Sequence, residues 1–194
     1  MRHVMSRIII LSCWSTHFAY WALAAFSVQP AQTKAGHAAL LGFRLFQLFS
    51  FVMLGGIIPF SPFNVRLWSG LPIMNVSGAT LCVSGTMVSI WVRRMLAGNW
   101  SASVTYKEKH ELVTKGPYRF VRHPIYSGLT LMMLGTVLVL GRLDSLFGFL
   151  MRFISYFFKI RKEETLLLEH FPEEYSRYRA RTGFLVPILR KETE

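Results

Sequence analysis

Charged residues are scarce in this chain. Asp, Glu, Lys and Arg make up only 16% of its 194 residues, against about a quarter in typical soluble domains. Acidic residues are the scarcer sign, with 10 against 22 basic residues and a formal net charge of +12. A basic protein can bind nucleic acid, but no basic helix here carries interleaved aromatics that stack on bases. The composition therefore predicts no nucleic-acid partner.

Several catalytic motifs are also missing. The sequence has no GxGxxG or Walker loop, which excludes the common phosphate-binding turns of soluble nucleotide folds. Its six histidines show neither HExxH nor HxxxH spacing, so no metal site is predicted. No GxSxG elbow is present for a serine hydrolase. The two cysteines, Cys13 and Cys82, lie inside apolar runs without a CxxC partner and are predicted to be inert buried thiols.

Long apolar runs are what the sequence does contain, since hydrophobic residues make up 52% of it. Ile8 to Val28, Ala39 to Phe60 and Ile73 to Leu96 are each roughly the length that crosses a hydrocarbon core of about 30 Å. The first run also resembles a signal peptide, but its length and its Trp and Tyr residues favour a retained helix. The third run repeats Val-Ser-Gly at 76–78 and 83–85, which predicts a seam where another helix approaches closely.

The last apolar region, Ile125 to Ile160, is divided by Gly141-Arg-Leu-Asp-Ser145. A turn there leaves two helices of roughly sixteen residues, short for independent spans, and predicts a tight helical hairpin. An amphipathic helix is expected from Glu163 to Tyr178, with Pro172 able to restart it. Thr182 to Pro187 is expected to form an apolar anchor.

Together these segments predict an all-α polytopic membrane protein with about five transmembrane helices. Residues 1–98 would hold three spans, and residues 99–194 a cytoplasmic cofactor-binding, catalytic region that includes the hairpin. Basic residues gather between Arg93 and Arg122 and again after Arg152, which places both groups on the cytoplasmic face although Arg2 and Arg7 then lie outside. The predicted location is a prokaryotic inner membrane, with the active site facing the cytoplasm.

The hairpin would return its two ends to one side of the membrane. Gly116 to Tyr126 would then lie beside Lys162-Glu163-Glu164. Pro124 suits a first helical turn, whose N–H groups and positive dipole end favour a ligand carboxylate. Arg122 adds charge, and the tyrosines of this segment add aromatic faces for a cation. An interfacial belt of aromatic and basic residues would also place such side chains here, but it explains scattered residues better than this packed set.

Three further charges allow two interpretations each. Glu163 and Glu164 would serve a ligand, or would only interact with a helix dipole. Arg152 lies inside the last apolar segment, where a charge is costly and usually faces a cavity or partner. It would bind an anionic substrate group, or extend to the membrane surface from a short helix.

The combination of His110-Glu-Leu-Val113, Gly116, Tyr118, Arg122-His-Pro-x-Tyr126 and Glu163-Glu164 resembles the isoprenylcysteine carboxyl methyltransferase family and its phospholipid-methyltransferase relatives. The resemblance covers roughly Asn99 to Pro187. It implies an integral membrane methyltransferase that uses S-adenosylmethionine and releases S-adenosylhomocysteine. It also implies cofactor-binding roles for His110, Glu111, Leu112, Val113, Gly116, Tyr118, Arg122, His123, Pro124, Ile125, Tyr126, Glu163 and Glu164. Catalytic or substrate-orienting roles fall to Glu163, Lys159, Arg161 and Arg152.

The implied substrate is the carboxylate of a prenylcysteine-like or other lipophilic molecule, with membrane lipids as further partners and no obligatory protein partner. One residue departs from the family pattern: Lys159 stands where the prenylcysteine enzymes have an arginine four residues before the first functional Glu. Lysine lacks the planar fork that binds a carboxylate, so a lipid amine and a small thiol stay open as acceptors. The sequence is also compatible with a sterol-type reductase that uses NADPH, and with a non-enzymatic membrane scaffold.

Overall fold

A computed structural model describes residues 2–25, 37–57, 62–96 and 112–188. Within these ranges the chain is helical, and its only β pairings are two isolated bridges. The helices are α1 Arg2–Ala25, α2 His37–Leu54, α3 Pro72–Leu96, a 3₁₀ turn η2 Gly116–Arg119, α4 Pro124–Leu140, α5 Leu143–His170 and α6 Pro172–Arg181. The all-α class is therefore confirmed.

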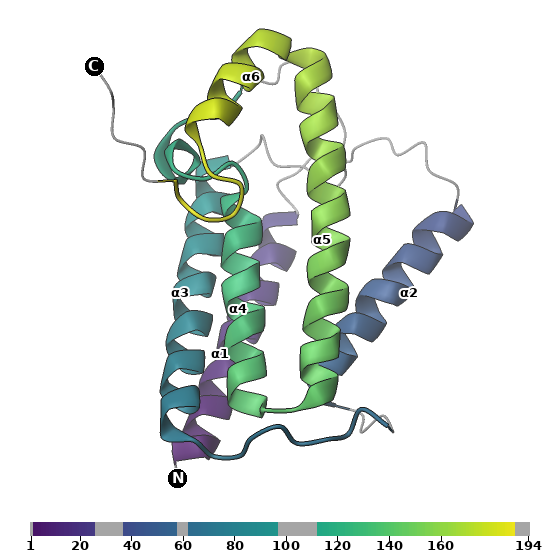
Figure 1. Ribbon diagram of the computed structural model, residues 1–194, viewed down its shortest axis with the longest axis vertical. Helices are drawn as coiled ribbons and strands as arrows, with labels where there is room; N and C mark the ends of the chain where they lie inside the picture. Colours follow the sequence, from purple (N-terminus) through teal and green to yellow (C-terminus); the bar gives the residue numbers. More distant parts are fainter. Residues whose placement is uncertain (1, 26–36, 58–61, 97–111, 189–194) are drawn as a thin grey trace.

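The helices form two groups (Figure 1). α1, α3 and α4 pack together, whereas α5 packs mainly along α2. The buried core of the described residues lies mostly within the first group. Its members are Ile10, Cys13, Trp14, Leu54, Cys82, Met132, Met133, Val137 and Val139. Both cysteines are buried and free, as predicted.

The predicted close approach of a helix to α3 is confirmed, and α4 is the partner. A Cβ added to Gly78 would lie 2.6 Å from the carbonyl oxygen of Gly135, and one added to Gly128 would lie 2.8 Å from that of Gly85. Each helix thus carries two glycines seven residues apart, and they meet in antiparallel order. Such small residues allow the two backbones to approach closely.

Substituting one glycine of this seam should loosen the α3–α4 contact. We expect Gly78→Ala to destabilise the protein by about 1–3 kcal/mol, because backbone at Gly135 must move to admit a methyl group. Gly42→Ala in α2 is the matched control, since a Cβ there meets nothing within 4 Å and alanine favours a helix. Thermal unfolding in detergent, followed by circular dichroism, measures both. Equal melting temperatures for the two variants would contradict the seam.

One helix, Pro72–Leu96, is long and apolar enough to cross a membrane by length and composition, with a mean hydropathy of 1.4 in its best window. Two shorter apolar helices, Leu41–Leu54 and Pro124–Leu140, accompany it among the described residues. Among the described residues, one helix meets this criterion. The predicted arrangement of about five transmembrane helices therefore stays a prediction.

The predicted turn between the last two apolar helices is confirmed. α4 ends at Leu140, Gly141 adopts a left-handed conformation (φ 60°), and α5 begins at Leu143. The expected length of the second arm was wrong, because α5 runs for 28 residues. Only one glycine and no proline interrupt α5, and its Lys, Glu and Leu residues favour a helix. Helix α5 therefore extends beyond the start of α4 and carries Glu163 and Glu164 with it (Figure 1).

The amphipathic helix expected over residues 163–178 is divided between two helices, and the predicted restart at Pro172 is confirmed. Its first half is the end of α5, and its second half belongs to α6, which starts at Pro172. Proline lacks a backbone N–H and clashes with the preceding turn, so it ends one helix and suits the first turn of the next. The chain reverses there, and α6 folds back toward η2 (Figure 1).

Candidate active site at the start of α4

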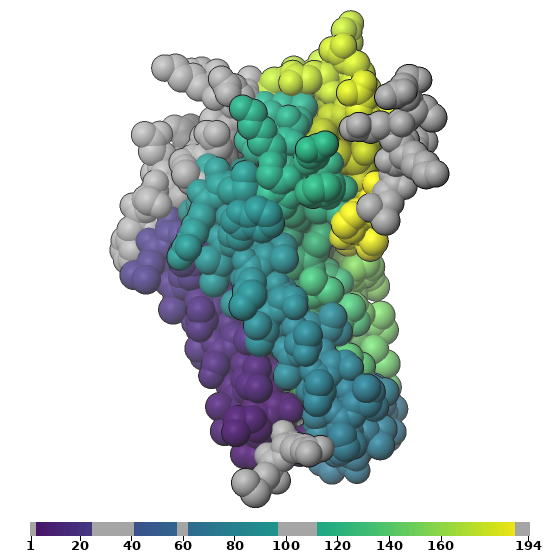
Figure 2. Space-filling model, turned by 90° about the vertical axis from the view of Figure 1, so that its left-hand side faces the viewer, coloured from purple at the N-terminus to yellow at the C-terminus, as the bar shows by residue number. Residues whose placement is uncertain are grey.

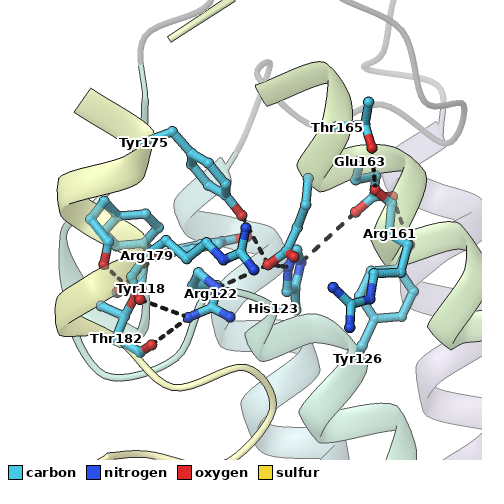
Figure 3. A network of polar contacts seen from close by, with 12 residues as sticks. Tyr118, Arg122, His123, Tyr126, Arg161, Glu163, Thr165, Tyr175, Arg179 and Thr182 are labelled. Atoms are coloured by element: carbon cyan, nitrogen blue, oxygen red, sulfur yellow. Dashed lines mark hydrogen bonds and ion pairs between the residues drawn. The ribbon is translucent and has the colours of Figure 1, made fainter. Parts of the chain in front are cut away.

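Three segments far apart in the sequence meet at the start of α4 (Figure 3). The first runs from η2 to Tyr126, the second is the end of α5 with Glu163 and Glu164, and the third is α6 with the residues that follow it. Arg122 and His123 lie against Glu164, and Tyr126 against Glu163. The predicted convergence of Gly116–Tyr126 with the acidic pair is therefore observed.

Glu164 is the centre of this cluster and is 3% exposed. Its Oε1 accepts hydrogen bonds from Arg122 Nε at 2.9 Å and from the Tyr175 hydroxyl at 3.0 Å, and lies 3.2 Å from His123 Nε2. Burial alone would raise the pKa of this carboxyl, but the hydrogen bonds from His123 and Arg122 outweigh burial and lower its pKa to about 2. Glu164 is thus ionised and enclosed by protein groups.

Arg122 ties the same cluster to the C-terminal part of the chain. Its Nη1 donates to the carbonyl oxygens of Arg179, at 3.1 Å, and Thr182. The backbone connects the same two segments. Val121 forms an isolated β-bridge with Gly183, and Arg122 N donates to Gly183 O at 2.8 Å. The 182–187 segment, expected as an apolar anchor, is therefore paired with the chain just before α4.

Glu163 is the neighbour of Glu164, but it faces a different environment, since adjacent helical residues point about 100° apart. Its Oε1 accepts a hydrogen bond from the Tyr126 hydroxyl at 2.7 Å, and its Oε2 lies 4.0 Å from His123 Nδ1. The side chain keeps 28% of its surface exposed. Among the described residues, Arg122 neutralises Glu164, whereas Glu163 is partly exposed and its nearest polar contacts are a phenol and an imidazole.

Aromatic rings lie next to this partly exposed carboxylate. The Tyr126 ring packs edge-on against Tyr156 at 5.3 Å, and the His123 ring lies 6.2 Å from that of Tyr126. Lys159 lies one helical turn before Glu163, with its Nζ 6.0 Å from the centre of the Tyr126 ring. A carboxylate flanked by aromatic faces is suited to a cationic group of a ligand.

The start of α4 supplies the other polar feature of the site. Pro124 occupies the first turn, and His123 precedes it without a side-chain cap to the helix. The first-turn N–H groups of an α-helix have no intrahelical partner and carry partial positive charge. Ile125 and Tyr126 carry two of these groups, and Tyr126 also donates its hydroxyl to Glu163. Negative ligand charge is therefore favoured here and positive charge beside Glu163.

Other predicted residues precede the start of α4 in the chain. Leu112 and Val113 are half-buried and precede η2. Gly116 has φ +62°, and any side chain there would collide with Met95 of α3. Burial raises the pKa of the Tyr118 phenol, and the Tyr118 carbonyl accepts the Tyr178 hydroxyl at 2.7 Å. His110 and Glu111 lie outside the described residues.

The three basic residues predicted to orient a substrate lie in different places. Lys159 is beside Tyr126, and the Arg161 guanidinium lies over the rings of Phe157 and Phe184, at 5.0 and 5.9 Å. Arg152 is connected to the cluster indirectly, through Tyr156, whose ring centre lies 5.6 Å from the Arg152 guanidinium and whose ring packs against Tyr126. Its Nη1 donates to the backbone carbonyl of Gln47 on α2 at 2.7 Å. Arg152 stands eleven positions before Glu163, about 16 Å along α5.

Two tyrosines of α6 belong to the site but were expected only on an amphipathic helix face. Tyr175 is 1% exposed and donates to Glu164. Tyr178 donates to the Tyr118 carbonyl, and burial raises its pKa to about 12 although the Arg122 charge opposes this. The signal for both was Pro172, because a helix restarted there can fold back and return its tyrosines to the end of α5.

Known proteins are similar in sequence to the part of the chain that contains this cluster. The family model described as phospholipid methyltransferase matches residues 73–174, more than half of the 194 residues and all of α4 and α5. That range holds Arg122, His123, Tyr126, Glu163 and Glu164, so the matched region contains most of the cluster.

Individual relatives are similar over shorter stretches. The protein-S-isoprenylcysteine O-methyltransferase of Schizosaccharomyces pombe is 37% identical over 83 residues, 41% of this chain and 34% of the relative. That of Saccharomyces cerevisiae is 31% identical over 120 residues, 60% of this chain and 50% of the relative. A probable enzyme of the same name from Oryza sativa subsp. indica is 33% identical over 87 residues, 44% of this chain and 46% of the relative.

The matches thus span between a third and a half of the length of these relatives. The family match covers α3 to the start of α6 and includes Arg122, His123 and Glu164 of the cluster, whereas Tyr175 follows the matched range. On this evidence the chain belongs to the phospholipid methyltransferase family.

Proposed function

We propose that the protein is an integral membrane methyltransferase that uses S-adenosylmethionine and methylates the carboxylate of a prenylcysteine-like or other lipophilic substrate. The observation that carries the proposal is the partly exposed Glu163 carboxylate, hydrogen-bonded to Tyr126 beside the start of α4, in a chain of this family. The relatives named above act, by their names, on isoprenylcysteine.

The residues at the site fit the two charges of this methyl donor. Glu163 and the Tyr126 ring would hold its cationic part, because a carboxylate and an aromatic face both favour a cation. The first turn of α4 would face its carboxylate, and the half-buried Leu112 and Val113 would border it. When bound, the donor supplies an electrophilic methyl group on a sulfonium.

The protein's own contribution is positioning and exclusion of water. A carboxylate acceptor needs no proton removed before it attacks, so no general base is required. Alignment of two reactants by itself accounts for a large share of such rate enhancements. Lys159 and Arg161, close to the site on α5, are the residues proposed to orient the acceptor, with Arg152 further along the helix toward its apolar end.

The membrane arrangement is part of the proposal. Five helices, α1 to α5, would cross or enter the bilayer, with the start of α4 on the cytoplasmic face, where basic residues gather. A lipophilic substrate would then enter from the bilayer and the cofactor from the cytoplasm. The relatives named above are eukaryotic, so no comparison supports the expected prokaryotic inner membrane.

A second candidate acceptor is a lipid amine. The family model that matches the chain carries the description phospholipid methyltransferase. Lys159 also lacks the planar guanidinium with which an arginine binds a carboxylate through two hydrogen bonds. A bound amine would be stabilised by an acidic side chain and would receive little stabilisation from the positive charge of Lys159. This makes acceptor choice a question for direct assay.

The assay uses detergent-solubilised protein and a donor with a radiolabelled methyl group. Prenylcysteine analogues, lipid amines and small thiols are offered in parallel, and label in an organic extract is counted. Calorimetric titration with S-adenosylhomocysteine and with NADPH separates the methyltransferase from a sterol-type reductase. Binding of neither cofactor would leave only a scaffold role and would remove the proposal.

The ring of Tyr126 should contribute measurably to donor binding. We expect Tyr126→Ala to weaken S-adenosylhomocysteine binding by about 1–3 kcal/mol, because the ring packs against the ligand. Tyr126→Phe keeps the ring and loses only the hydrogen bond to Glu163, so its affinity should lie between those of the wild type and the alanine variant. Calorimetry measures all three. An unchanged affinity in Tyr126→Ala would count against the contact.

A further inference from the structure

An open apolar groove lies between α1 and α3, away from the candidate active site. Its volume is about 590 Å³. Ile8 and Cys13 of α1 and Val83, Met87 and Trp91 of α3 contribute to its lining, and Arg94 stands at one end. Figure 2 shows the face of the molecule on which α1 and α3 lie side by side. Within the described part of the chain, the residues that line this groove all belong to α1 and α3.

The end of the groove that carries Arg94 is the end nearest the active site. Met95, the next residue, is the one that a side chain at Gly116 would strike. The Arg94 guanidinium lies 5.7 Å from the centre of the Tyr20 ring, and Trp91, one helical turn earlier, is 53% exposed. Aromatic and basic side chains of this kind gather where a membrane helix meets the headgroups.

From this arrangement we infer that the groove binds a phospholipid with an anionic headgroup. One acyl chain would lie along the apolar lining, and the phosphate would meet Arg94. Charge complementarity selects this occupant, because the groove has a guanidinium at its headgroup end and the chain carries a net charge of +12. The inference relies on the proposed membrane location but not on methyl transfer.

The experiment measures retained lipid directly. Full-length protein in mild detergent is incubated with equal amounts of phosphatidylglycerol and phosphatidylcholine and analysed by native mass spectrometry. We expect phosphatidylglycerol to be retained in preference by about fivefold, the effect of one basic residue near an anionic headgroup. Arg94→Gln should abolish this preference.

Matched variants separate the groove from general charge attraction. Arg177→Gln on α6 removes the same charge from an exposed position outside the groove and should leave the preference unchanged. Val83→Trp narrows the groove and should reduce retention of both lipids, with circular dichroism verifying that the helices persist. Equal effects of Arg94→Gln and Arg177→Gln, full retention in a folded Val83→Trp protein, or a dimer in place of bound lipid would each overturn the inference. Because retained mass is the readout, these outcomes stay distinct from failure of the methyl-transfer assay.

Discussion

Glu163→Gln should lower methyl transfer by about 100-fold or more while the protein stays folded, a loss of about 3 kcal/mol in transition-state stabilisation. Glutamine keeps an oxygen that can accept the Tyr126 hydroxyl, so the hydrogen bond seen at 2.7 Å has a replacement. Only the negative charge is removed. Opposite unit charges about 4 Å apart interact by about 4 kcal/mol at an effective dielectric constant near 20, and the 28% exposure of Glu163 reduces that figure.

Glu169→Gln is the matched control, because it removes one carboxylate from an exposed position on the same helix. Both variants are assayed with the radiolabelled donor and titrated with S-adenosylhomocysteine. Activity of the control should equal that of the wild type. A Glu163→Gln protein that turns over at the normal rate would remove Glu163 from the site and leave the cationic part of the donor without its proposed partner.

The sequence predicted that Gly116–Tyr126 would meet the acidic pair, because this convergence depends on where the helices begin, end and turn. Gly141 favours a left-handed turn, and that turn reverses the chain so that the end of α5 returns to the level of the start of α4. The bounds predicted for the third apolar segment, Ile73 to Leu96, differ from those of α3 by one residue, since Pro72 and the apolar residues after it define the helix start locally. The glycine seam followed from the seven-residue repeat in α3, although its partner helix did not.

Local rules did not separate the roles of Glu163 and Glu164, although the family resemblance implied a catalytic role for Glu163 but not for Glu164. They are adjacent and chemically identical, and only the rotation of α5 decides which one is buried. That rotation is fixed by packing against α2 and by the return of α6, both of which are tertiary contacts. Arg152 was ambiguous for the same reason, because its partner Gln47 lies 105 positions earlier in the sequence.

Glu164→Gln should detach the C-terminal part of the chain from the site. Glu164 receives hydrogen bonds from Arg122 and Tyr175 and contacts His123, so it joins α5, α6 and the segment before α4. Its pKa falls from an ordinary value of 4.5 to about 2 in the folded chain, which corresponds to stability on the order of 3 kcal/mol at neutral pH. Glutamine removes the charge and leaves the Arg122 guanidinium half-buried without its carboxylate.

The stabilising contribution of Glu164 should depend on pH in a definite direction. Because the carboxyl has a lower pKa in the folded chain than in the unfolded chain, its contribution is complete above about pH 4.5 and is lost as the pH falls toward 2. The difference in unfolding free energy between wild type and Glu164→Gln should therefore be constant from pH 7 to 5 and shrink below that range. Glu173→Gln, at an exposed position of α6, should show a small difference at every pH.

Hydrogen exchange over residues 171–185 locates the effect. Faster exchange there in Glu164→Gln, with α3 and α4 unchanged, is expected because Arg122 and Tyr175 connect this segment to the buried carboxylate. If exchange instead rises uniformly along the chain, Glu164 stabilises the whole fold. If it does not change, the contacts with Glu164 are not what holds α6 against the site.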